Sequence, residues 1–118
     1  MAHRYKTYTS SDGTTFHYFF AFSRRVSRPE GEGSGTDYVF VVTPDQTVPF
    51  VIRLFVSDRA LRAWETEHRR TMESSETYAA AKLRLFRAFD ETAATRVAWL
   101  DLAVDEANVA ELLAPLDL

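Results

Sequence analysis

Two stretches rich in aromatic and β-branched residues, 15–26 and 48–56, constrain the fold most, because both faces of each strand would be apolar. An antiparallel sheet with one solvated face alternates apolar and polar residues more cleanly. Cover is expected from helices on one side and from a partner subunit, a ligand pocket or a further helix on the other. A monomer that exposes scattered apolar residues is the alternative. The two faces of 15–26 would carry Phe16, Tyr18, Phe20 and Phe22 on one side and His17, Phe19 and Ala21 on the other. Those of 48–56 would carry Val48, Phe50, Ile52, Leu54 and Val56 on one side and Val51, Arg53 and Phe55 on the other.

Four strands are predicted in the first half of the chain. They cover residues 5–9, 15–26, 38–43 and 48–56, with a hairpin turn at Ser11-Asp12-Gly13. Residues 28–37, with one proline and three glycines, are expected to form a flexible hairpin loop. Short connections between consecutive strands favour an antiparallel meander.

After Ser57 the apolar period changes from two to about 3.6, which predicts helices. Asp58 is expected to cap the first helix, and Ser74 or Ser75 the second. Residues 96–104 alternate as a fifth strand, and Asp105 can cap a final short helix over 106–114. The predicted fold is α+β, in the order β-β-β-β-α-α-β-α. Its antiparallel sheet has four to five strands, with two to three helices packed on one face.

Length and composition predict one soluble domain over residues 1–118. The longest apolar stretches are far shorter than the roughly 20 residues of a bilayer span, and no signal peptide is visible. The chain has no cysteine, which excludes disulfides and thiolate zinc sites and fits a reducing compartment. We expect a cytoplasmic protein that does not contact membranes.

Tyr8, His17 and Arg53 form the candidate ligand-binding group. If the strand registers place these residues side by side, a phenol, an imidazole and a guanidinium would project from an apolar surface and bind an anion. A small enzyme acting on an anionic substrate through His17 and Arg53 is one alternative function. A strand histidine and arginine at an interface or a sheet rim is the simpler interpretation.

Two short motifs favour structure over chemistry. Glu65 and His68 have the Glu-x-x-His spacing of di-iron sites, but such sites need two of these motifs and further carboxylates. The glycine-rich segment 31–35 is followed by a strand, whereas a phosphate loop leads into a helix. No catalytic residues, metal site or cofactor are predicted.

Charge is unevenly distributed along the chain, whose net charge is −3. Residues 1–87 carry 13 basic and 10 acidic side chains, and residues 88–118 carry one arginine against seven carboxylates. Arg24, Arg25 and Arg28 lie at one strand end, so a nucleic-acid-associated protein is a second alternative. The acidic total argues against it. Of the 14 basic residues only Lys6 and Lys82 are lysines, a bias that GC-rich codons also produce.

The function that these patterns favour is a non-catalytic interaction or ligand-binding module. It would form a homodimer through the second face of the sheet, with Phe19, Val51 and Phe55 in the interface, because two-fold homo-oligomers are the commonest assemblies. A different protein that binds the same face is the other possible partner.

Overall fold

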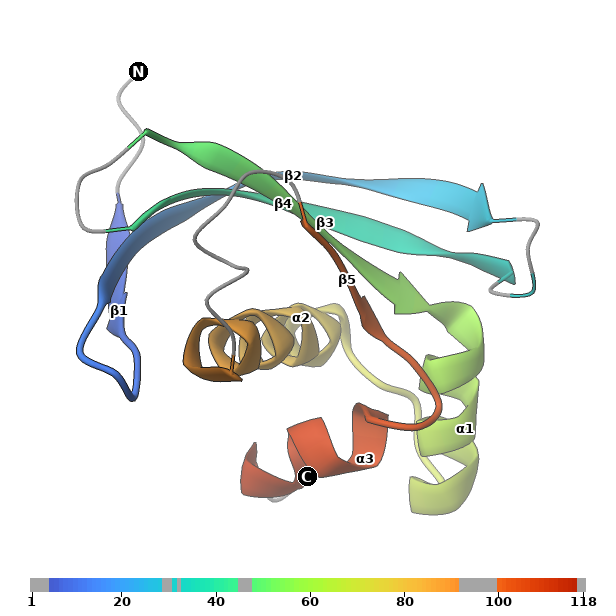
Figure 1. The fold of residues 1–118 in the computed structure, drawn as a ribbon. Coiled ribbons are helices and arrows are strands. Elements are labelled where there is room, and N and C mark those ends of the chain that lie inside the picture. The colour runs from blue at the N-terminus through green and yellow to red at the C-terminus, as the bar shows by residue number, and fades with distance from the viewer. Residues whose placement is uncertain (1–4, 29–30, 32, 45–47, 92–99, 117–118) are drawn as a thin grey trace.

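The computed structural model describes residues 5–28, 31, 33–44, 48–91 and 100–116, and the chain folds as a sheet above three helices (Figure 1). The strands are β1 (Lys6–Thr9), β2 (Thr15–Arg28), β3 (Gly33–Pro44), β4 (Phe50–Ser57) and β5 (Leu100–Val104). The helices are α1 (Asp58–His68), α2 (Ser74–Glu91) and α3 (Val109–Leu113), followed by the 3₁₀ turn η2 (Ala114–Leu116). The predicted α+β class and order of elements are confirmed. Of the predicted fifth strand, residues 96–99 lie outside the described part.

The sheet is mixed, so the prediction of a purely antiparallel sheet was wrong. Its strand order is β1-β2-β3-β4-β5; the first four strands form the expected antiparallel meander, and β5 runs parallel to β4. The cause is the connection, because α1 and α2 lie between β4 and β5 in the chain. A connection that contains helices can return the chain to the starting end of the sheet, which a tight hairpin cannot do.

All three helices lie on the same side of the sheet and cover one of its faces (Figure 1). The core between the layers includes Phe16, Phe40 and Ile52 from the sheet, Trp64 from α1 and Leu85 from α2, each at most 2% exposed. The C-terminal segment belongs to this core, because Val104 and Leu113 are buried in it. No helix in the described residues is long and apolar enough to span a membrane.

Strands β2 and β3 extend through most of the range predicted as a loop. Arg24–Arg28 pair with Gly33–Asp37, so residues 28 and 33–37 of the predicted loop belong to the strands. Gly35 lies in the ladder, paired with Val26 and Ser57, and the backbone of Val56 and the ring of Phe55 approach it closely. A Cβ atom at this position would lie 2.5 Å from the backbone oxygen of Val56 and 2.6 Å from the ring of Phe55. Of the glycines that suggested a loop, Gly35 therefore allows close packing within the sheet.

A β-bulge at Ala21 changes the faces of β2. Phe20 pairs with Phe40, whereas Phe22 pairs with Val39, the next residue on β3. One extra residue reverses the alternation of side chains beyond it. The prediction that Phe22 shares a face with Phe16, Tyr18 and Phe20 was therefore wrong.

The N-cap of helix α1 lies one residue before the position predicted from the sequence. Ser57, not Asp58, is the N-cap, and its Oγ accepts a hydrogen bond of 3.0 Å from the backbone N–H of Ala60. Asp58 is the first helical residue, where its charge favours the positive end of the helix dipole. Asp105 accepts hydrogen bonds from the backbone N–H groups of Ala107 and Asn108 in the turn before α3.

Candidate functional site

The sheet face opposite the helices carries a strip of apolar side chains, here called the open-face strip. Strand pairing places its members in two adjacent rows across β2, β3 and β4. Phe22 is 49% exposed, Val39 is buried, and the others are partly buried. The strip consists of Phe19, Phe22, Val39, Val41 and Val51.

The two aromatic residues of the strip, Phe19 and Phe22, differ in their contacts with other aromatic rings. Tyr5 packs edge-on against Phe19 with ring centroids 5.0 Å apart, and it is itself 47% exposed. Among the described residues, Phe22 shows no ring contact with another aromatic side chain. Contiguous exposed apolar patches, in contrast to single exposed side chains, are typical of contact surfaces.

The structure does not bring His17 and Arg53 together. Both lie on the open face, but His17 pairs with Thr43 and Arg53 pairs with Val39. Four residues along the strands and two strand spacings separate them, or about 13 Å by 10 Å. The combined backbone distance of about 16 Å is too long for both side chains to hold one small anion.

Tyr8 lies on the other side of the sheet, facing the helices. Its ring stacks on Phe86 at 4.4 Å, and its hydroxyl donates a 2.7 Å hydrogen bond to Asp90. That hydrogen bond, followed by burial, raises the pKa of Tyr8 to about 12. Tyr8 therefore fastens the edge strand β1 to α2 and does not join the other two candidates.

Phe55, predicted to lie in an interface, is on the open face but only 1% exposed. The guanidinium of Arg28 covers its ring at 4.5 Å from the centroid and donates a 2.9 Å hydrogen bond to the buried Asp37. This ion pair and the ring form a closed cluster at one end of the face. Phe55 thus offers no surface, whereas Phe19 and Val51 remain partly accessible.

The three arginines of the nucleic-acid alternative do not form one surface. Arg24 and Arg28 project from the open face, whereas Arg25 projects from the helix-bearing face. Arg25 donates hydrogen bonds of 2.9 and 2.5 Å to Asp58, and this contact lowers the pKa of the Asp58 carboxyl. Arg25 and Arg28 are thus engaged within the fold, and Arg24 is exposed.

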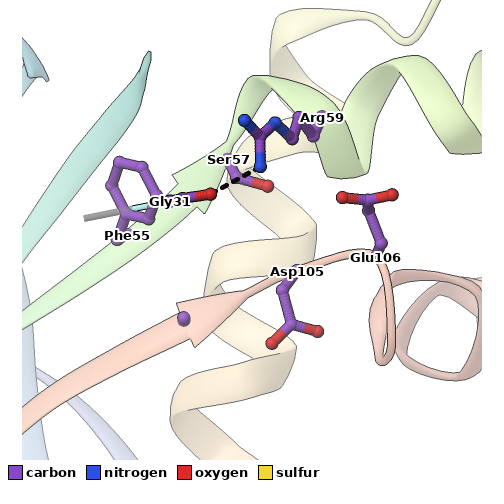
Figure 2. A pocket seen from close by; sticks show the side chains of 7 residues that line it. Gly31, Phe55, Ser57, Arg59, Asp105 and Glu106 are labelled. Carbon is purple, nitrogen blue, oxygen red and sulfur yellow. Dashed lines mark hydrogen bonds between the residues drawn. The ribbon is translucent and has the colours of Figure 1, made fainter. Parts of the chain in front are cut away.

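A small cavity of about 110 Å³ lies where β4 leads into α1 (Figure 2). Arg59 donates a hydrogen bond across its rim to the carbonyl of Gly31, and the acidic residues Asp105 and Glu106 follow from β5 (Figure 2). Because the Asp105 carboxylate already caps the turn before α3, the cavity has few polar groups left for a ligand.

A larger groove of about 440 Å³ runs between β1, α2 and the C-terminal segment. Its polar groups form pairs, Tyr8 with Asp90 and Arg87 with Glu111, the second at 3.2 Å. The charged side chains of the groove are thus already engaged with one another or with Tyr8.

Glu65 and His68 have structural roles. His68 stacks on Trp64 at 4.2 Å, and Glu65 accepts a 2.7 Å hydrogen bond from the backbone N–H of Met72. Within the part of the chain that the structure describes, no three metal-ligating side chains gather.

Comparisons with protein-family models, with curated proteins and with solved structures find no match. Inferences about function therefore depend on the geometry of this chain.

Sequence reasoning missed three members of the open-face strip, Phe22, Val39 and Val41. The bulge that turns Phe22 outward has no strong sequence signal. Val41 was inside a predicted strand, and only the register with Phe19 and Val51 shows which face it occupies.

Proposed function

We propose that this protein is a non-catalytic interaction module that forms a homodimer through the open-face strip. The observation that carries the proposal is the strip itself. The row of Phe19, Val41 and Val51 crosses three strands, whereas the row of Phe22 and Val39 ends at Arg53 on β4. Phe22 is about half exposed, and its partner Val39 is buried.

A second copy of the chain is the partner that this face suits best. In a two-fold dimer one patch meets its own copy, so an apolar strip faces an apolar strip. Sheets that pack face to face lie about 10 Å apart with interdigitating side chains, which suits rings and branched residues. Flanking residues such as Thr7, Thr43 and Arg24 would form the polar rim.

Sedimentation of the full chain tests the dimer. We expect a dimer at micromolar concentration, and we expect Phe22→Glu to convert it to a monomer. Each interface would lose two buried rings worth about 1.5–3 kcal/mol each, which raises the dissociation constant at least about hundredfold.

Val48→Glu is the matched control, because Val48 is 81% exposed and lies before β4. It should leave the dimer intact. A wild-type chain that sediments as a monomer at every concentration would overturn the proposal. So would a dimer that Phe19→Glu and Phe22→Glu both leave unchanged, since it would use another surface.

A further inference from the structure

Strand β2 continues far beyond the strand that pairs with its outer side. β1 pairs with residues 15–18 of β2, whereas the pairing of β2 with β3 continues to Arg28. In Figure 1, β2 accordingly extends past β1 to the opposite end of the sheet. Within the described part of the chain, residues 23–28 therefore form an outer edge of the sheet, here called the β2 edge.

The β2 edge is regular and accessible. Beyond the bulge at Ala21, β2 pairs with β3 residue by residue as far as Arg28. Four of the six residues of the edge are exposed, and the edge contains no proline. Every second residue of such an edge directs its backbone N–H and C=O groups away from the sheet, where they can bind a further strand. The edge thus has the geometry that β-strand addition uses.

Positive charge lines this edge on both faces of the sheet. Arg24 and Arg28 project from the open face, and Arg25 projects from the helix-bearing face. Arg25 pairs with Asp58 and Arg28 with Asp37, but in each pair the arginine is the more exposed partner, at 62% against 21% and at 25% against 2%. Arg24 is exposed and forms no ion pair among the described residues. A strand added beside this edge therefore meets guanidinium groups first, and acidic side chains suit it.

The same charges argue against a second copy of this edge as the added strand. Antiparallel pairing centred on Val26 would place Arg24 of one chain opposite Arg28 of the other, and like charges directly opposite one another destabilise a sheet. The arrangement also differs from a nucleic-acid surface, because the three arginines are divided between two faces and share only the backbone edge between them.

The other borders of the sheet suit an acidic strand less. β1 has only four residues. β5, at the opposite border, leads into the acidic residues Asp105 and Glu106, which would repel such a strand. Among the described residues, the β2 edge thus combines length with positive charge.

We propose that the β2 edge binds an extended acidic segment of another protein, which adds to the sheet as a further strand. Backbone groups of residues 23–28 hold the segment by hydrogen bonds, and its acidic side chains pair with Arg24 and Arg28 on the open face. An apolar side chain between the two acids contacts Val26. The segment lies at the border of the sheet and not on the open-face strip, so this interaction does not depend on the dimer.

Binding of a synthetic peptide tests the site. The probe is fluorescein-labelled Thr-Glu-Thr-Val-Thr-Glu-Thr, whose glutamates and valine share one face and whose palindromic order fits either strand direction. In one control peptide both glutamates are replaced by lysine. In the other, Thr-Glu-Pro-Val-Pro-Glu-Thr, the prolines keep the charge but prevent strand pairing. In fluorescence anisotropy at low salt, we expect the full chain to bind the probe at least about tenfold more tightly than either control.

Two charge-reversed variants locate the site. Arg24→Glu should weaken binding of the probe at least about threefold, because an opposite-charge pair across the strands becomes a like-charge pair. Lys6→Glu makes the same change in net charge on β1 and should leave the affinity within about twofold of the wild type. Unchanged thermal unfolding shows that each variant is folded. Equal losses in the two variants would indicate attraction to the overall charge and would overturn the proposal.

Amide hydrogen exchange distinguishes strand addition from contacts made by side chains alone. The bound probe should slow exchange in the segment 23–28 at least about threefold and should leave β5 unchanged. Equal binding of the probe and its controls, or protection confined to other segments, would contradict the assignment. A 12-nucleotide oligothymidylate that binds through Arg24 while the probe does not bind would also overturn it, since the edge arginines would then contact phosphates.

Discussion

At the scale of single residues, Gly35 shows how the absence of a side chain allows close packing. Its missing side chain lets the backbone oxygen of Val56 and the ring of Phe55 approach the β3 backbone. The same ring is covered by Arg28, whose guanidinium also pairs with the buried Asp37. This end of the sheet is therefore closed by a glycine, a ring and an ion pair that depend on one another.

Replacement of Gly35 by alanine should destabilise the fold. The added methyl group would clash with the Val56 carbonyl, which is backbone and cannot move aside alone. We expect the free energy of unfolding in urea to fall by roughly 1–3 kcal/mol, with an unchanged m value. The neighbouring exposed Ser34→Ala should change it by less than about 0.5 kcal/mol. Equal effects of the two substitutions would contradict the close contact.

At the scale of elements, the ends of helices and the regularity of strands depend on single contacts. Ser57 ends β4 and caps α1, so one residue sets the angle between the strand and the helix. The bulge at Ala21 similarly divides β2 into two parts with opposite facing patterns. The Ser57 cap and the Ala21 bulge are both local features. The sequence did not distinguish them, because Asp58 is an equally good N-cap residue and the residues around Ala21 all favour a regular strand.

Ser57→Ala should lower the free energy of unfolding by about 1 kcal/mol, because the backbone N–H of Ala60 loses its buried acceptor. Ser57→Thr keeps the hydroxyl and should recover most of this stability in the same urea experiment. A neutral Ser57→Ala together with a destabilising Asp58→Ala would instead assign the cap to Asp58.

At the scale of the whole molecule, the described C-terminal residues 100–116 of the acidic last quarter pack into the core. β5 completes the sheet beside β4, and α3 packs against α1 and α2. Arg87 on α2 pairs with Glu111 on α3, so some of the acidic charge faces the basic body of the protein. The described part of the acidic segment is thus packed within the fold and is not a detached tail.

Leu113→Ala should therefore destabilise the entire domain. Leu113 is 2% exposed, and its truncation leaves a cavity that costs about 2–5 kcal/mol. Circular dichroism and tryptophan fluorescence should report one coincident transition, since Trp64 of α1 shares the core with α3. Leu116→Ala, at a residue 40% exposed, should cost far less. A separate early loss of the C-terminal segment would contradict a single core.

The sequence by itself determined the class of the fold and the order of its elements. Apolar spacing is a local property, and periods of two and of 3.6 distinguish strands from helices without reference to the rest of the chain. It also indicated that both faces of the sheet are apolar, from residues such as Phe19 and Val51.

Only the tertiary structure decided which residues meet. Strand register separated His17 from Arg53, sheet faces separated both from Tyr8, and a bulge turned Phe22 toward the open face. The parallel pairing of β5 with β4 also joins segments far apart in the chain. Contacts of this kind depend on register and on the direction of connections, and neither leaves a periodic pattern in the sequence.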